Sequence, residues 1–415
     1  MTCIQLVLNA QAPLAIGRSK PGGSISQSET YIPGSVIRGA IASELIRLSE
    51  SENHDFSTGE DDFNALFLGE NAAIFQNAYP VEYSKIQNPA LTRVIPSTAA
   101  TAKSNPGFIG KGAGVFDTLI DRYCARLHGQ IYDPVFPDEA GGRVEPLSGF
   151  YQEIAAGQYV TPSVSTRLLT RVGINRRRAT AQEKILYSIE VINETESGKN
   201  HPACFMSYLH LPDQSLCDPL VKFLDGRIIR VGGSASRGLG KVKLEAKRLK
   251  KKLNFRKRYD TFNQCVGKQW RQWNQLFAMN ATINAETFKQ LRFFSINLES
   301  DAILQEDWQR TMVLSPQLLQ EFANIPNDSL QLEGSSCSYD YVSGWNSAWG
   351  LMKDTDLITQ KGACFLYSIH SEHECDWLRA LEHLENMGVG DRRTEGFGQI
   401  YVCNPFHLNT RETII

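Results

Sequence analysis

The feature that most constrains the fold is a glycine-rich segment that occurs twice in register. The first copy, RVGGSASRGLGKVKLE, covers residues 230–245, and the second, MGVGDRRTEGFGQIYV, covers residues 387–402. Val231-Gly232, five residues and Gly238-Leu239-Gly240 align with Val389-Gly390, five residues and Gly396-Phe397-Gly398. Two unrelated turns would explain the glycines, but not the shared spacing and the apolar flanks. The repeat therefore predicts a duplicated domain.

Neither copy fits a nucleotide-binding fingerprint. A phosphate loop needs glycine, four residues and Gly-Lys-Ser/Thr, whereas Gly240-Lys241 is followed by Val242, and Ala235 stands at the first glycine. A dinucleotide fingerprint that starts at Gly238 needs glycine where Lys243 stands. We expect the glycines to let an RNA backbone come close to the main chain and its N–H groups.

The residues around each copy predict strand, helix, glycine loop and strand. In the first half, strands are expected at 2–10, 184–192, 202–211 and 240–246, with helices at 35–48, capped by Ser35, and 218–224. In the second half, a strand pair is expected within 354–369, a helix at 375–387 and a strand at 398–404. The order predicts an α+β fold with two tandem ferredoxin-like (RRM-like) domains and long inserted loops. Such a domain leaves one sheet face free for RNA.

The domain limits follow from these elements. We expect an N-terminal ferredoxin-like domain with insertions over residues 1–246, a basic helical connector over 247–284 and a C-terminal ferredoxin-like domain over 285–415. The insertion at 97–114 is rich in small residues and is expected to be mobile, and a second insertion covers 129–151.

The composition is that of an ordinary soluble protein, with 42% hydrophobic and 21% charged residues among 415. A formal net charge of −2 excludes a globally basic coat for nucleic acid but allows local basic surfaces. Nine cysteines without CxxC pairing, and no signal peptide or long apolar run, predict a cytoplasmic protein without a disulfide framework.

Cationic side chains beside the glycines predict RNA phosphate contacts, because guanidinium groups bind phosphate bidentately and stack on bases. The alternative for each position is a tight turn or a helix face that carries solvated charges. The predicted RNA-binding residues are Arg18, Lys20, Arg171, Arg176, Arg177, Arg178, Gly232, Gly233, Arg237, Gly238, Gly240, Lys241, Gly390, Arg392, Arg393, Gly396 and Gly398.

Metal-ligand and catalytic patterns are sparse. Cys124 and His128 lie four residues apart, and His370, His373 and Cys375 lie close together, but neither group has a second cluster to complete a zinc site. No hydrolase or metalloprotease motif occurs in the sequence. We therefore expect no catalytic residue, no metal and no cofactor.

The segment Ile32-Pro33-Gly34-Ser35-Val36-Ile37-Arg38-Gly39-Ala40 resembles the helix start of the RAMP (repeat-associated mysterious protein) superfamily of CRISPR-associated proteins, and the glycine loops resemble those of the same superfamily. Segments 170–192 and 145–151 are similar to a narrower group, the two-domain RAMP subunit of type III-D effector complexes. The resemblance implies a non-catalytic, RNA-binding scaffold subunit that holds the 5′ repeat-derived tag of the guide RNA in antiviral defence. It also implies contacts with the large polymerase-like subunit and with backbone RAMP subunits.

Two other functions stay open. RAMP proteins include metal-independent endoribonucleases that process CRISPR precursor RNA, and here His54 is the candidate general base. A structural subunit that touches only protein is the third possibility. Some relatives carry paired cysteines before a segment like 147–151, but DEAGGRV stands there in this chain, so no zinc site is expected.

Overall fold

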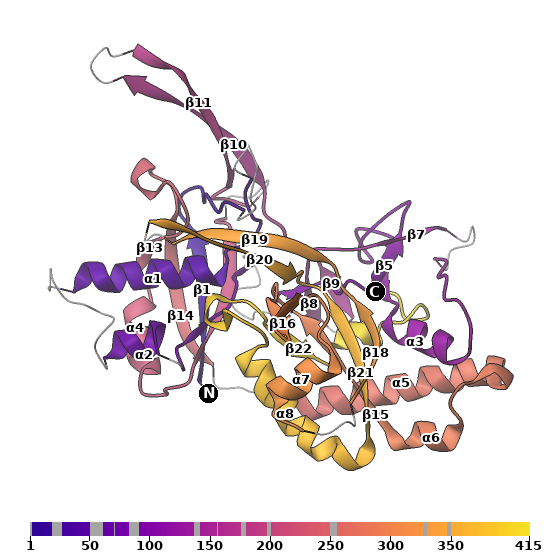
Figure 1. Cartoon of the computed structure of the whole chain (residues 1–415). Coiled ribbons are helices and arrows are strands. Elements are labelled where there is room, and N and C mark those ends of the chain that lie inside the picture. Colours follow the sequence, from indigo (N-terminus) through magenta and orange to yellow (C-terminus); the bar gives the residue numbers. More distant parts are fainter. Residues whose placement is uncertain are drawn as a thin grey trace.

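The chain forms two halves, each built on an antiparallel sheet with helices against it (Figure 1). We call residues 2–249 the N-terminal half and residues 255–415 the C-terminal half. The computed structural model describes residues 2–18, 27–49, 61–69, 71–82, 91–136, 142–155, 157–175, 180–196, 201–249, 255–326, 330–346 and 350–415. Within these ranges, no helix is both long and apolar enough to cross a membrane.

The sheet of the N-terminal half is organised around its first strand. Ile4, Leu6 and Leu8 are fully buried, and because alternate residues of a strand share a face, all three point to one side. They pack there with the buried residues of two helices, α1 (Gly34–Leu48) and α4 (Cys217–Leu224). The strand order is β13-β14-β1-β12-β2, and β3 also pairs with β12. These strands are β1 (Thr2–Ala10), β2 (Ile74–Phe75), β3 (Tyr79–Val81), β12 (Cys204–Leu211), β13 (Ile228–Arg230) and β14 (Lys241–Leu249).

Helix α1 begins without the expected serine cap. Its N-cap is Pro33, which makes no side-chain cap hydrogen bond, and Ser35 lies inside the first turn. The prediction that Ser35 caps this helix is therefore wrong. Ile37 and Ile41 are buried as the periodicity predicts, whereas Leu48 at the helix end is 45% exposed.

The sheet of the C-terminal half is covered on both faces. Phe293 and Phe294 are adjacent on β15 and so point to opposite sides. Phe294 lies 5.8 Å from the Trp377 ring of α8, and Phe293 lies 5.4 Å from the Tyr123 ring of α3. Helix α5 covers the same face as α3, where Asn263 hydrogen-bonds both main-chain groups of Phe293. The strand order is β18-β21-β15-β22. The elements of this half are α5 (Phe255–Phe277), β15 (Leu291–Leu298), α7 (Pro316–Ala323), β18 (Gln331–Ser336), β21 (Cys364–His370), α8 (Glu374–Met387) and β22 (Ile400–Val402), whereas α3 (Leu119–Leu127) comes from the N-terminal half.

This arrangement corrects two expectations. The second sheet has no face free for RNA, because the predicted connector forms α5 and packs on that face together with α3. The connector also begins later than expected, since residues 247–249 extend β14. Short elements complete this half: α6 (Ala285–Gln290), β16 (Leu304–Glu306) and β17 (Gln309–Thr311).

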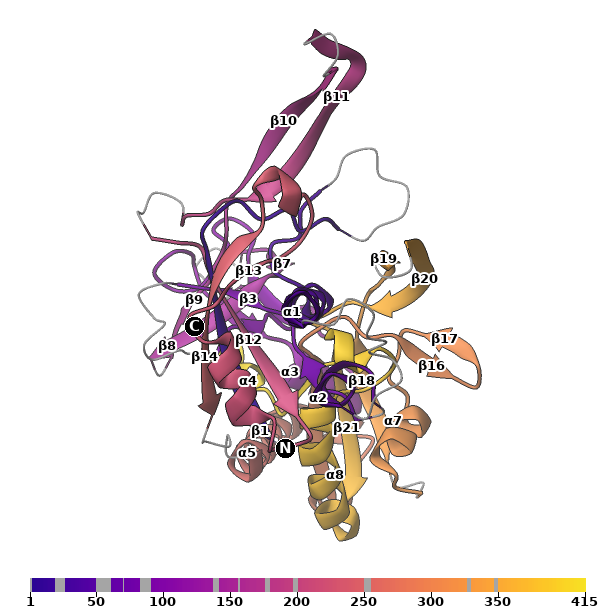
Figure 2. The ribbon, with the colours of Figure 1, turned by 90° about the vertical axis from the view of Figure 1, so that its left-hand side faces the viewer.

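Each half carries a two-stranded hairpin arm between the second and third strands of its sheet (Figure 2). The arm of the N-terminal half projects far from the body (Figure 1). Its strands include residues 184–192, so the prediction that this segment belongs to the main sheet is wrong. The second arm includes 354–359, which pairs with 339–342 and not with 364–370, so the strands in 354–369 do not form a pair. The arms are β10 (Thr166–Asn175) with β11 (Thr180–Ile192), and β19 (Tyr339–Asn346) with β20 (Leu351–Thr359).

The insertion between β3 and the first arm is ordered rather than mobile. Residues 99–102 are all buried and form the centre of a small sheet with order β6-β5-β7. A second small sheet has the order β4-β8-β9. The prediction that 97–114 is mobile is therefore wrong, because its small side chains pack against the C-terminal half. The strands of the insertion are β4 (Arg93–Val94), β5 (Ala99–Ala102), β6 (Val115–Asp117), β7 (Val144–Pro146), β8 (Phe150–Ala155) and β9 (Gln158–Val160), and the short helix α2 (Asp62–Phe67) lies earlier, between α1 and β2.

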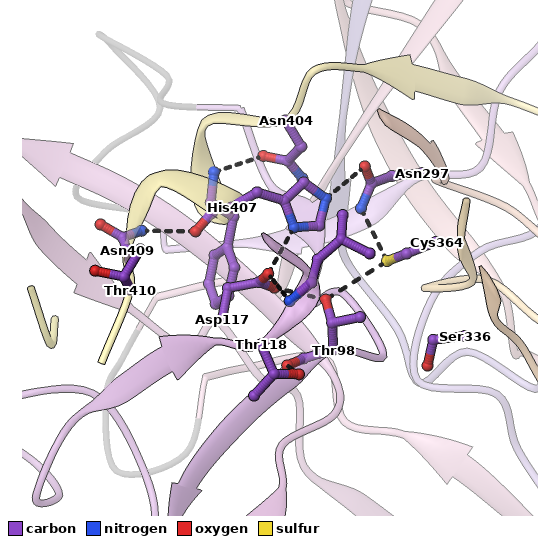
Figure 3. A network of polar contacts seen from close by, with 12 residues as sticks. Thr98, Asp117, Thr118, Asn297, Ser336, Cys364, Asn404, His407, Asn409 and Thr410 are labelled. Carbon is purple, nitrogen blue, oxygen red and sulfur yellow. Dashed lines mark hydrogen bonds and ion pairs between the residues drawn. The ribbon is translucent and has the colours of Figure 1, made fainter. Parts of the chain in front are cut away.

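A buried ion pair attaches this insertion to the C-terminal half (Figure 3). His407 Nδ1 lies 3.0 Å from Asp117 Oδ1, and both side chains are at most 1% exposed. His407 Nε2 lies 2.9 Å from Asn297 Oδ1, so both ring nitrogens face oxygen acceptors. Although burial opposes the charged form, the Asp117 carboxylate raises the pKa of His407 to about 10. Thr98 and the Leu119 N–H donate to the same carboxylate, at 2.5 and 2.9 Å, so the Asp117 oxygens are hydrogen-bonded and the ion pair is a structural contact.

Candidate nucleic-acid interface

The two glycine-rich segments have the same backbone. In each, a single 3₁₀ turn is flanked by two residues in the left-handed region. The φ angles of the first loop at positions 232, 234, 238 and 240 are 78°, 58°, 85° and 82°. Those of the second loop at positions 390, 392, 396 and 398 are 76°, 54°, 94° and 66°. The alignment read from the sequence is therefore also an alignment of conformation.

Main-chain hydrogen bonds fix each loop to the segment that follows the first strand of its own half. The Gly240 N–H donates to Pro13 O at 2.9 Å, and the Gly398 N–H donates to Asp301 O at 2.8 Å. Next to these, the N–H of residue 233 donates to the carbonyl of residue 15, and that of 391 to the carbonyl of 303. Each loop is thus fixed at both of its ends by main-chain hydrogen bonds to its own half.

Four of the glycines are required by the chain's own backbone. A Cβ on Gly232 would meet Ala15 O, and one on Gly390 would meet Ile303 O. A Cβ at 240 or 398 would meet the carbonyl of the valine that opens the same loop. The positive φ of these residues independently favours glycine. The interpretation that these glycines make room for RNA is corrected, because the room is taken by the protein itself.

The second loop is docked against the N-terminal half, at the start of α1. A Cβ on Gly396 would lie 2.7 Å from Phe75 O, and one on Gly34 would lie 2.9 Å from Glu395 O, so the two backbones touch. Directly after Gly398, Gln399 Oε1 accepts from the Gln76 side chain at 2.8 Å. The repeated loop therefore serves here as a contact between the halves.

Acidic partners neutralise the charges of the second loop. Arg392 lies 2.8 Å from Glu395 and 3.3 Å from Asp356, and Lys353 lies 2.8 Å from Glu395. These cations lower the pKa of Glu395, although burial opposes the effect. Arg393 is exposed and forms no ion pair with any described residue. RNA binding by Arg392, Arg393, Gly390, Gly396 and Gly398 stays a prediction.

The first loop faces outward and is cationic. A Cβ on Gly238 would meet nothing within 4 Å, and Arg237 beside it is exposed. Arg171, from the arm strand β10, donates to Arg237 O at 3.5 Å, and the Arg237 guanidinium lies 5.4 Å from the Tyr187 ring centroid on β11. The structure thus brings together residues that are 66 positions apart in the sequence.

Two more cations lie directly opposite one another beside this loop. Arg230 and Lys241 are cross-strand partners in the β13–β14 pair, and both are exposed. Like charges in such a pair repel one another, which favours an anion between or above them. The Arg230 guanidinium donates to Ala235 O and Leu239 O at 3.0 and 3.2 Å, so it is held against the loop. We call Arg171, Arg230, Arg237 and Lys241 the cationic cluster. None of its members forms an ion pair within the part of the chain that the structure describes.

Other predicted residues lie apart or beyond the described ranges. Arg18 is near the partly exposed Glu29, at 3.7 Å, and Gly233 contributes the N–H that binds Ala15 O. Lys20, Arg176, Arg177 and Arg178 lie outside the described residues, as does His54.

Sequence reasoning missed Arg230 and Tyr187. Arg230 opens the first glycine-rich segment, just before Val231, and a hairpin expected around this loop would have paired it with Lys241. Tyr187 gives no such signal, because only the fold brings the arm to the loop.

The candidate metal ligands do not form a site in the described ranges, where no group of three His, Cys, Asp or Glu side chains is placed to hold a metal ion. His128 Nδ1 hydrogen-bonds the main-chain oxygen of Cys124 at 2.7 Å. The four-residue spacing of Cys124 and His128 therefore reflects a contact at the end of helix α3 and not a pair of metal ligands.

Comparison with known proteins gives a family. The model of the RAMP superfamily matches residues 10–243. No curated protein matches the sequence. Three similar solved structures are a chain of the type III-B Cmr-beta complex bound to cognate target RNA, Cmr4 from Pyrococcus furiosus, and Cas6 in a product complex. Their identities are 12%, 12% and 13%, and their TM-scores are 0.43, 0.26 and 0.28. The alignments cover 95%, 60% and 49% of this chain and 96%, 99% and 81% of those chains.

Proposed function

Because the chain belongs to the RAMP superfamily, we propose that it is a CRISPR RNA-binding subunit of a type III, III-D-like effector ribonucleoprotein. In this role it holds the 5′ repeat-derived tag of the guide RNA and contacts the large subunit and backbone RAMP subunits. It acts in antiviral defence as a scaffold without catalytic activity.

The strand orders support two tandem ferredoxin-like domains. Numbered along the chain, the four main strands of the N-terminal half are β1, β2, β12 and β14, and their spatial order is 4-1-3-2. The strands of the C-terminal half, β15, β18, β21 and β22, have the same order. Each half also has a long helix between its first and second strands, α1 or α7, and another between its third and fourth, α4 or α8, as a β-α-β-β-α-β module requires; the N-terminal half adds the short α2 after α1.

The observation that carries the proposal is a reversal of charge between two copies of one loop. Glu395 in the docked second loop aligns with Arg237 in the first loop. The second loop meets the N-terminus of α1, which carries the positive end of the helix dipole and therefore favours a nearby acid. An arginine at that position disfavours the same docking and favours a phosphate. The first loop, with three further cations beside it, is therefore specialised for RNA rather than for a helix start.

The non-catalytic assignment rests on the same residues. Segment 230–241 contains no histidine, aspartate or glutamate, so none of its side chains can act as a general base at physiological pH. The cations of the cluster can bind and position phosphates, which is what a scaffold for a guide needs.

Crosslinking with mass spectrometry on the purified ribonucleoprotein tests the proposal. We expect peptides containing Arg171 and residues 230–241 to crosslink to the first nucleotides of the guide. Crosslinks only to the far end of the guide would refute tag binding. If RNA crosslinks are absent from this chain altogether, the protein-only scaffold is correct.

A further inference from the structure

A tryptophan stands at the tip of a tight turn in the C-terminal half. Strands β16 and β17 pair as far as Glu306 and Gln309, so the hairpin turns on Asp307 and Trp308 alone. Figure 2 shows this hairpin at the edge of the molecule. Trp308 is 94% exposed, and no hydrogen bond, ring contact or cation–π contact joins it to any residue that the structure describes. Trp270 and Trp377, in contrast, are buried.

The turn holds this side chain where glycine is favoured. The φ angles of Asp307 and Trp308 are 47° and 65°, both in the left-handed region. Two-residue hairpin turns with two positive φ angles strongly prefer Asp-Gly or Asn-Gly, because a bulky side chain is strained at the second position. A single exposed apolar residue is ordinary on a protein surface. A tryptophan at a strained position reduces the stability of its own fold, which indicates a role outside it.

Contacts with three other elements hold the hairpin in place. Arg310 of β17 pairs with Asp391 of the second loop at 2.7 Å and with Asp356 of β20 at 2.9 Å. On the opposite strand, Glu306 accepts a hydrogen bond from Ser315, the N-cap of α7. A partner that binds the tip therefore does not have to order the hairpin, which lowers the entropy cost of binding.

The charges at the tip favour a protein over RNA. Asp307 is exposed and lies next to the tryptophan, and the one cation of the hairpin, Arg310, is already held by two carboxylates. A phosphate would thus meet a negative charge and no unpaired cation of the hairpin. The Tyr187 ring has the opposite surroundings, because it lies beside Arg237 of the cationic cluster. A carboxylate beside an apolar anchor is complementary to an apolar pocket with a basic rim.

We propose that Trp308 anchors this chain to another protein subunit, which receives the indole in an apolar pocket rimmed by lysine or arginine side chains. Tryptophan often dominates the free energy of an interface, because its rigid ring buries a large area at a small loss of conformational entropy. One ring fills only the centre of an interface, and the exposed Asp307 and Gln309 form part of the rim. Taking the partner from the same ribonucleoprotein rests on the proposed function, whereas the presence of a protein-docking anchor does not.

Photocrosslinking identifies the partner in the purified ribonucleoprotein, with Trp308→benzoylphenylalanine as the probe. We expect mass spectrometry to map the main adduct to another protein subunit, at a segment with apolar residues and more basic than acidic ones. An adduct with the guide RNA, with a second copy of this chain or with an acidic segment would overturn the proposal. The absence of any adduct with another chain would also overturn it.

The variant Trp308→Gly separates docking from folding. The urea midpoint of the full chain should stay the same or rise, because glycine adopts a positive φ without strain. A lower midpoint would show that Trp308 stabilises the fold and would overturn the proposal. The affinity of the full chain for the remainder of the ribonucleoprotein should fall about thirtyfold, as for a dominant anchor. The matched control is Asp307→Gly in the same turn, which should cost at most about fivefold, since it removes only a rim charge. Equal affinities of the wild type and Trp308→Gly would refute the anchor.

Guide-RNA binding by the full chain alone distinguishes this proposal from the proposed function. Trp308→Gly should leave the affinity and its salt dependence unchanged, whereas Arg237→Glu should reduce both. If Arg237→Glu binds the guide like the wild type while position 308 crosslinks to a protein subunit, the anchor stands and the proposed function fails. If Arg237→Glu weakens guide binding while Trp308→Gly keeps full affinity for the remainder of the complex, the proposed function stands and the anchor fails.

Discussion

Replacing Arg237 with glutamate tests the proposed role of the first loop directly. The substitution gives this loop the charge that Glu395 has at the aligned position of the second loop. It leaves the glycines and the loop's main-chain hydrogen bonds unchanged. The Arg237 side chain is exposed, and Tyr187 is its one contact among the residues that the structure describes, so the fold should tolerate the change.

The size of the effect follows from the number of cations. If all four residues of the cationic cluster contact phosphates, the slope of log affinity against log salt should be about −2.8, at about −0.7 per contact with single-stranded RNA. Losing one contact brings the slope to about −2.1, and the repulsive carboxylate should reduce it further. Loss of the contact should reduce the binding free energy by about 1.5 kcal/mol, the lower end of the range for a hydrogen bond to a charged group, because the position is exposed. At one salt concentration this corresponds to a roughly tenfold loss of affinity.

The assay is fluorescence anisotropy of a labelled guide RNA titrated with the full chain over a series of salt concentrations. Lys289→Glu is the matched control, because Lys289 on α6 is 70% exposed and undergoes the same charge change away from the loop. A wild-type slope for Arg237→Glu, or an equal loss for Lys289→Glu, would refute the reasoning. If Arg393→Glu in the second loop reduces the slope as much as Arg237→Glu, both loops bind RNA and the division of roles is wrong.

Three further predictions concern stability and catalysis. In urea unfolding, Gly238→Ala should lower the free energy of unfolding by about 1–2 kcal/mol, because its φ is positive. Gly396→Ala should lower it by about 1–3 kcal/mol more, because its Cβ would also meet Phe75 O. Equal losses for the two variants would contradict the docking of the second loop. Asp117→Asn should destabilise the chain by about 3–5 kcal/mol by leaving the His407 imidazolium unpaired. Since the folded-state pKa of His407 is raised to about 10, the pair's contribution should be complete below about pH 6.5 and lost as pH rises through about 10, which unfolding at several pH values measures. Purified protein should not cleave repeat RNA without metal, and cleavage that His54→Ala abolishes would identify the chain as an endoribonuclease.

Local patterns predicted the repeat and most of the regular elements. The glycine spacing located both loops, and periodicity located α1, α4 and α8, because a buried helix face leaves a regular apolar stripe. The sequence of residues 184–192 correctly predicted a strand, but a strand's local pattern does not reveal its partner. The segment pairs within a projecting arm and not within the main sheet.

The parts that could not be predicted depend on contacts between distant segments. Nothing near Gly396 in the sequence indicates that it meets Phe75, and nothing near residues 99–102 indicates that they pack against the C-terminal half. The role of the glycines was misread for the same reason, since the segments that press on them are distant along the chain. The aligned pair Arg237 and Glu395 was visible from the start, and comparing the charges of the two copies would have separated the loops.

The start of α7 sets a limit on how the duplicated design can continue. Helix α1 receives the second loop at Gly34, its first residue, where a side chain would collide with Phe75 O and approach Glu395 O. The corresponding helix of the C-terminal half begins with Pro316 and not with glycine. Proline suits the first position of a helix, but it carries a Cβ and a ring that glycine lacks. A third module therefore would not find at α7 the glycine at which the second loop meets α1, and growth of an assembly from the C-terminal half requires a different kind of contact.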